Sequence, residues 1–98
     1  MTSEQPNKEI SAELGEMIYR YIYKRVSENI GKPVVMNMTH LSENSYDREN
    51  PTDSINKLVE ALTRWLGQRV VENIIINVER EITDQNAKNF LNEIKSGK

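Results

Sequence analysis

The clearest helical pattern in the chain is SINKLVEALTRWL, residues 54–66. Its apolar side chains recur at spacings of three and four, which places them on one side of an α-helix. We expect Asp53 or Thr52 to cap this helix, because their side-chain oxygens can accept hydrogen bonds from its first N–H groups. The apolar stripe is Ile55, Leu58, Val59, Leu62, Trp65 and Leu66.

Gly67 follows directly and raises the question of whether the helix continues. In an unbroken helix the next apolar residues would centre about 160° away from the first stripe. A straight helix cannot direct both groups at one core. We therefore expect Gly67 to break or kink the chain, or the two halves to serve opposite surfaces.

Residues 69–82 fit either a helix or a strand. As a helix they are amphipathic, with only Ile76 out of place. Half of them are β-branched, which favours a strand, but fourteen residues is long for a strand. We prefer the helix; in the alternative, Ile74, Ile76, Val78 and Ile82 face inward.

A first helix is expected from about Asn7 to Ile30, with apolar residues on two sides. Residues 1–7 are too polar to repay ordering and are expected to form a disordered tail. Gly31 and Pro33 suit the end of the helix. One apolar side holds Ile10, Leu14, Met17, Ile18, Tyr21 and Ile22, and the other holds Ala12, Gly15, Tyr19, Tyr23, Val26 and Ile30.

The remaining segments are shorter. Residues 34–41 fit a strand or a helix, and we favour the helix; residues 42–52 form a polar loop with almost nothing to bury. Thr83 or Asp84 caps a last helix, whose buried stripe is Ala87, Phe90, Leu91 and Ile94. The fold predicted for residues 8–95 is a single all-α domain, a bundle of three to five helices. The alternative is a small α+β domain with short strands near 34–40 and 70–79.

Composition narrows the possible functions. The chain has 98 residues, 37% of them hydrophobic, a formal net charge of −2 and no cysteine. The absence of cysteine excludes disulfides and thiolate chemistry and favours a reducing compartment. The polar N-terminus resembles no signal peptide, and no apolar run is long enough to span a bilayer. We therefore expect a cytoplasmic protein that does not bind membranes.

No group of residues suggests catalysis. His40 is the only histidine and has no nucleophile signature around it. The acidic residues Asp47, Glu49 and Asp53 lack the glycine that a calcium loop requires at its sixth position, where Thr52 stands. We accordingly expect no enzyme activity, no metal site and no cofactor.

Two kinds of binding surface remain. Because the total apolar content is low, apolar stripes on more than one side suggest surface in excess of what one core needs. We therefore predict a protein-interaction or accessory protein, acting as a homodimer or with another protein. The predicted contact residues are Tyr19, Tyr23, Val26, Ile30, Trp65, Val71 and Ile75.

The alternative function is a small nucleic-acid-binding regulator. The segment YRYIYKR, residues 19–25, interleaves aromatic and basic side chains, as surfaces that bind single strands do. On a helix, only Tyr21, Lys24 and Arg25 share one side. The last helix is a second possibility, since Asn86, Asn89 and Asn92 are residues that read bases.

Overall fold

The computed structural model describes residues 10–95 and contains five helices and no strand within that range. The all-α prediction is confirmed, and the α+β alternative is wrong, because 34–39 and 70–79 are both helical. The predicted tail over residues 1–7 lies outside the described range. The helices are α1 (Ala12–Ile30), α2 (Lys32–Thr39), α3 (Pro51–Leu66), α4 (Gln68–Glu81) and α5 (Gln85–Lys95).

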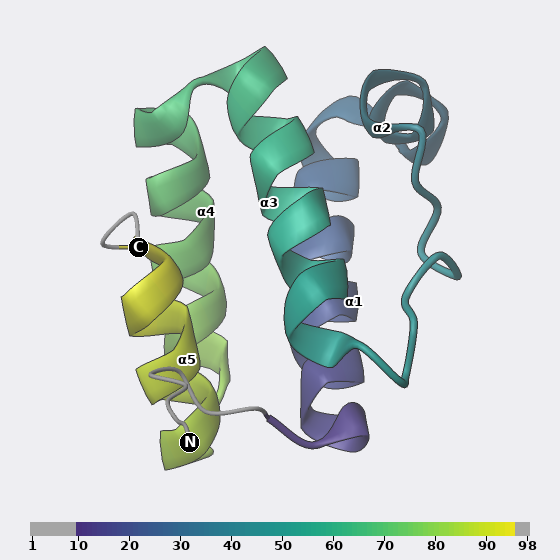
Figure 1. The fold of residues 1–98 in the computed structure, drawn as a ribbon. Helices are drawn as coiled ribbons and strands as arrows, with labels where there is room; N and C mark the ends of the chain where they lie inside the picture. The colour runs from purple at the N-terminus through teal and green to yellow at the C-terminus, as the bar shows by residue number, and fades with distance from the viewer. Residues whose placement is uncertain (1–9, 96–98) are drawn as a thin grey trace.

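Helix α1 is the central element of the bundle. It contacts each of the other four helices, with α3 and α4 packed along it and α5 against α4 (Figure 1). Helix α2 lies at the end of the bundle where α1 ends and α3 turns into α4. This central position explains why α1 is apolar on two sides, since neighbours within the same chain cover both.

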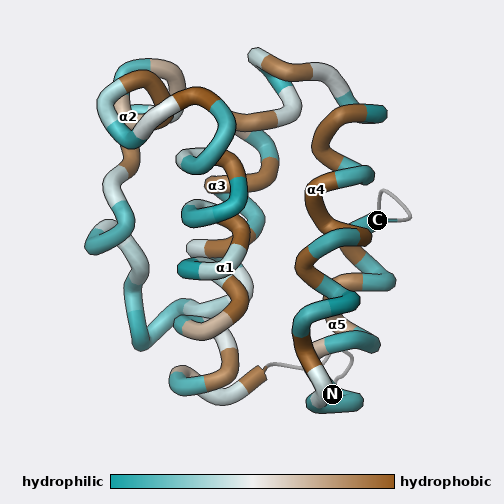
Figure 2. Tube along the Cα trace, turned by 180° about the vertical axis from the view of Figure 1, so that it is seen from behind, coloured by the Kyte–Doolittle hydropathy of each residue, from teal (hydrophilic) through white to brown (hydrophobic). Residues whose placement is uncertain are grey.

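The core draws on all five helices. Ile18, Ile22, Ile55, Leu58 and Leu62 have no exposed surface at all. Figure 2 shows hydrophobic and hydrophilic segments alternating along the long helices, as expected where each helix buries one side. Burying each such aliphatic side chain contributes roughly 1.5–3 kcal/mol to the free energy of folding.

Local signals set the helix ends, and two of the predicted starts are corrected. Helix α1 begins after Ser11, whose hydroxyl accepts a hydrogen bond from the N–H of Leu14 (3.1 Å), rather than near residue 7. Helix α3 begins at Pro51, ahead of the predicted caps Thr52 and Asp53. Proline is favoured in the first helical turn because its ring presets φ and no helical partner is needed there.

The predicted cap of the last helix is correct for one of its two candidates. The Asp84 carboxylate accepts hydrogen bonds from the N–H groups of Asn86 (2.8 Å) and Ala87 (3.1 Å). These contacts satisfy two of the donors that a helix leaves free at its N-terminus. Asp84 therefore marks the start of α5.

Single glycines join two pairs of helices. Gly31 (φ 92°) links α1 to α2, and Gly67 (φ 93°) links α3 to α4. Residues with a Cβ rarely adopt this backbone conformation. The break expected at Gly67 is confirmed, and it lets both apolar stripes flanking the glycine face one core.

The segment between α2 and α3 is anchored by tyrosines, so the expectation of a loop with almost nothing to bury is wrong. Tyr46 is half-buried, and its ring centroid lies 5.5 Å from that of Tyr19. Three tyrosine hydroxyls donate to backbone carbonyls: Tyr19 to Ser42 (2.8 Å), Tyr23 to Leu41 (2.8 Å) and Tyr46 to Ala12 (2.7 Å).

Gly15 marks the place where this segment crosses α1. It is buried, and a Cβ added there would lie 2.8 Å from the Cβ of Pro51 and also against the hydroxyl of Tyr46. Carbon atoms at that separation clash, because packed carbons sit about 3.5–4.0 Å apart. The missing side chain is therefore what lets the segment approach the helix.

Candidate functional site

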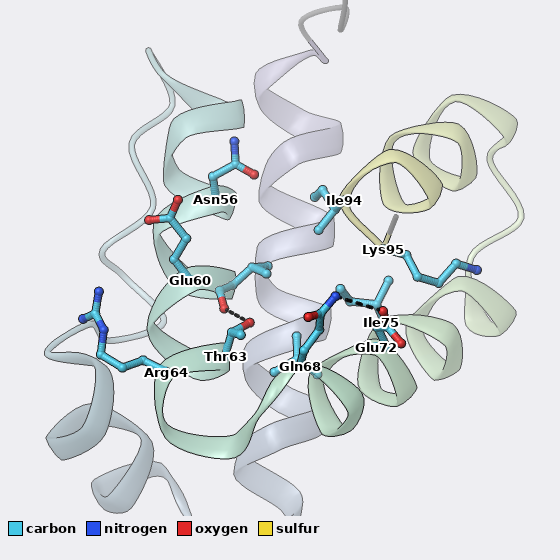
Figure 3. Close-up of a pocket in the computed structure, with 11 residues that line it drawn as sticks. Asn56, Glu60, Thr63, Arg64, Gln68, Glu72, Ile75, Ile94 and Lys95 are labelled. Atoms are coloured by element: carbon cyan, nitrogen blue, oxygen red, sulfur yellow. Dashed lines mark hydrogen bonds between the residues drawn. The ribbon is translucent and has the colours of Figure 1, made fainter. Parts of the chain in front are cut away.

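A groove of about 610 Å³ runs between α3 and α4 and is flanked by the end of α5. Figure 3 shows α3 on one side, α5 on the other and α4 forming the lower wall. Its apolar floor is Val59, Val71, Ile75 and Ile94, and its rim is polar: Asn56, Glu60, Thr63, Arg64, Gln68, Glu72 and Lys95.

Most polar groups on the rim already have partners within the chain. Thr63 donates a hydrogen bond to the carbonyl of Val59 (2.7 Å), and the Gln68 amide donates to the Glu72 carboxylate (3.3 Å). The Lys95 ammonium pairs with Glu79 (3.1 Å).

Glu60 and Arg64 differ from these neighbours. Both are exposed on α3, and neither belongs to any ion pair among residues 10–95. Glutamate and arginine one helical turn apart have a spacing that often supports pairing. Their charges are therefore available to a molecule that covers the groove.

A second feature is an apolar end of the bundle, which we define as Val34, Met36, Trp65 and Val70. These are the large hydrophobic side chains classed as exposed in the described range, at 45%, 49%, 61% and 46% respectively. Val34 and Met36 belong to α2, and the other two flank the Gly67 junction. Figures 1 and 2 both place α2 and the α3–α4 junction at the same end of the bundle.

Five of the seven predicted contact residues are buried within the chain. Tyr19 is 1% exposed and Tyr23 is 2% exposed. The prediction that they form surplus surface is wrong, because other helices and the segment after α2 cover them. The remaining buried members are Val26, Val71 and Ile75, of which the last two form part of the groove floor.

The other two predicted contact residues remain at the surface. Trp65 is the most exposed large hydrophobic residue described, and Ile30 is partly exposed where α1 ends. Val34, Met36 and Val70 were missed because helical periodicity does not show which apolar side chains remain exposed after the helices pack. The exposed apolar residues therefore lie at the apolar end of the bundle, and most of the predicted contact residues lie in the core.

The predicted nucleic-acid patch retains little free positive charge. Tyr21 is partly buried, and Lys24 is exposed. The Arg25 guanidinium forms a hydrogen-bonded ion pair with Glu81 of α4 and lies 3.9 Å from Glu28. Two acidic side chains therefore neutralise half of the patch.

Helix α5 offers an equally limited basic surface. Lys95 pairs with Glu79, which leaves Lys88 as the other lysine of the helix. Asn86, Asn89 and Asn92 are exposed, although Asn89 accepts a hydrogen bond from the Gln85 amide (3.0 Å). Phosphate binding depends on several cations acting together, and neither surface groups them.

The residues considered for catalysis and metal binding have structural roles. His40 ends α2 in the left-handed conformation (φ 60°), and its N–H donates to the carbonyl of Met36 (2.8 Å). The Asp47 carboxylate accepts hydrogen bonds from the Asn50 amide and the Glu49 N–H, which lower its pKa. Residues 10–95 contain no cluster of three or more histidine, aspartate or glutamate residues suited to a metal ion.

The pKa values that the structure shifts move away from neutral pH: those of Tyr19, Tyr23 and Tyr46 are raised, and those of Glu43 and Asp47 are lowered. Burial and the neighbouring Tyr23 raise the pKa of Tyr19 to about 12. A hydrogen bond from Lys32 and its positive charge lower the pKa of Glu43. A general acid or base works best with a pKa near the working pH, so these groups do not suit that role.

Comparison of the chain with protein-family models, curated proteins and solved structures gives no match. Within residues 10–95, no helix combines the length and hydrophobicity needed to cross a bilayer. The candidate site accordingly rests on the geometry of the chain itself.

Proposed function

We propose that this protein is a non-enzymatic interaction protein that binds another protein chain through the apolar end of its bundle. The observation that carries the proposal is that the large exposed hydrophobic residues Val34, Met36, Trp65 and Val70 belong to α2 and to the α3–α4 junction, which lie at the same end of the bundle. Soluble domains rarely group large exposed apolar side chains without a binding role. Aromatic residues, tryptophan above all, are enriched among the residues that dominate binding energy at protein interfaces.

Surrounding charges suit a polar rim around this contact. Arg69, which directly precedes Val70 in the sequence, is exposed and belongs to no ion pair in the described part of the chain. Interfaces typically surround an apolar centre with such groups. The proposed partner therefore combines an apolar contact with acidic side chains at its edge.

The proposal is tested by photo-crosslinking from position 65. A photoreactive phenylalanine analogue replaces Trp65, and the same analogue at the exposed position 73 of α4 is the control. In a lysate of the native cells we expect a defined protein adduct from position 65 only. Adding Met36→Ser and Val70→Ser should reduce that adduct at least tenfold, since each removes exposed apolar surface without touching the core.

The same adducts at positions 65 and 73 would overturn the proposal, as would no adduct at either position. Trp65 is the only tryptophan in the chain, so its fluorescence reports on this end directly. Once the partner is purified, the emission of the unmodified protein should shift to shorter wavelength on binding, because the indole ring leaves water.

A further inference from the structure

The groove between α3 and α4 offers a second contact, separate from the apolar end. Thr63 lies on the groove rim, whereas Trp65, two residues later, points about 200° away around the helix. A molecule seated in the groove would therefore leave Trp65 accessible. This inference does not rest on the proposed function.

The residues outside the described range are mostly polar. Residues 1–9 and 96–98 contain one large apolar side chain, that of Met1. The floor of the groove, by contrast, is aliphatic. A second copy of this chain would bring the same aliphatic floor to the contact.

The acidic and basic side chains on the groove rim could pair with the same side chains of a second copy of the chain. Glu60 and Arg64 lie one turn apart on α3, and neither pairs with a described residue. Figure 3 shows both side chains projecting from this helix, each clear of the other. If a second copy of α3 packs antiparallel, Glu60 meets the partner's Arg64 and Arg64 meets the partner's Glu60. The two contacts are equivalent under a twofold axis near Leu62.

The rest of the rim agrees with this arrangement. Among the lining residues, Glu60 and Glu72 are acidic and Arg64 and Lys95 are basic, and Lys95 already pairs with Glu79 of α4. A surface that must match itself needs both signs in balance, whereas a site for a strongly charged ligand would carry an excess of one sign.

We propose that two copies of this chain associate through the α3–α4 groove, with α3 helices antiparallel and two reciprocal Glu60–Arg64 ion pairs. The groove spans about two turns of α3, roughly 12 Å from Asn56 to Arg64, so the contact is small. We expect a dimer with a dissociation constant on the order of micromolar. Added salt should weaken it, because the ion pairs lie at an exposed rim.

Charge reversal tests this arrangement. In sedimentation velocity from about 1 μM to about 1 mM, the unmodified chain is expected to pass from monomer to dimer, with its midpoint near that dissociation constant. Glu60→Arg alone and Arg64→Glu alone should each weaken association at least tenfold, since each opposes like charges. An equimolar mixture of these two variants should form a heterodimer, and the double variant Glu60→Arg/Arg64→Glu should restore the homodimer.

The control for these variants is Arg69→Glu, which changes an exposed arginine outside the groove and should leave the dimer intact. Circular dichroism of each variant separates loss of association from loss of folding. A chain that stays monomeric up to about 1 mM overturns the inference. A dimer that survives both reversals but dissociates with Trp65→Ser also overturns it, and would place the contact at the apolar end instead.

Discussion

At the level of single residues, the buried tyrosines combine an apolar ring in the core with a hydroxyl that hydrogen-bonds to the backbone, which a purely hydrophobic residue cannot do. The rings of Tyr19 and Tyr23 are buried in the core. The Tyr19 hydroxyl donates a hydrogen bond to the carbonyl of Ser42, and the Tyr23 hydroxyl donates one to the carbonyl of Leu41. A net hydrogen bond of this kind is worth about 0.5–1.5 kcal/mol. The segment after α2 is therefore held against α1 by named contacts.

Tyr19 should make the stability of the protein fall at high pH. Its pKa is about 12 in the folded chain and 10.0 ordinarily, so its contribution is intact below pH 10. As the pH rises from 10 to 12, Tyr19 ionises first in the unfolded chain, and its own contribution to the free energy of unfolding falls by about 2 kcal/mol. Urea titrations across this range should show a steeper loss for the unmodified protein than for Tyr19→Phe. Equal slopes would refute the assignment.

At the element scale, two single-glycine junctions decide how the helices turn. Gly67 has φ 93° and ψ 154°, and a Cβ placed there would meet nothing within 4 Å. Glycine is therefore favoured at position 67 because of the positive φ angle and not because a side chain would clash. The same junction sets α4 beside α3 and so creates the groove between them.

Gly67→Ala should therefore destabilise the protein by about 1–3 kcal/mol without any steric clash. Chemical denaturation measures the loss, and Gln68→Ala, at the first residue of α4, is a matched control expected to be nearly neutral. If Gly67→Ala were as stable as the Gln68→Ala control, the backbone conformation at this junction would not require glycine, and the prediction would be wrong.

At the scale of the whole molecule, the two proposed contacts are compatible. The groove and Trp65 lie on different sides of α3, so a dimer formed through the grooves would present two apolar ends. Two linked binding sites raise the apparent affinity for a partner that is itself paired. The molecule would then act as a small two-ended adaptor.

Association should also appear in the thermal stability. A partner that binds only the folded chain stabilises it by mass action, so the midpoint of unfolding should rise with protein concentration. Scanning calorimetry over a hundredfold range of concentration measures this rise, and Arg64→Glu should abolish it. A midpoint that is independent of concentration in the unmodified protein would contradict the dimer.

Periodicity within each segment was sufficient to predict most of the fold. The stripe from Ile55 to Leu66 and the glycine after it determine α3 and its end, whatever packs against them. Residues 69–82 were ambiguous because their β-branched content favours a strand, whereas their length favours a helix. Their helical form follows from packing, since Val71, Ile74, Ile75 and Val78 are buried together only on a helix.

The candidate site was only partly predictable from the sequence. Trp65 was identified correctly as exposed apolar surface, while Tyr19 and Tyr23 were assigned to an interface although they lie in the core. Side-chain spacing determines which side of a helix is apolar, but it carries no information about which neighbour covers that side. Tyr46 contacts Tyr19 with its ring centroid 5.5 Å away, although the two residues are far apart in the chain.

Local sequence pattern was enough to predict α1, α3 and α5, their apolar sides and the break at Gly67, because these depend on interactions within a turn or two of the backbone. Only the tertiary structure decided that α1 is enclosed by its own chain, that one end stays apolar and that a groove opens beside α3. Those properties depend on contacts between residues far apart in the chain. The sequence around each of two contacting residues does not show whether the contact forms.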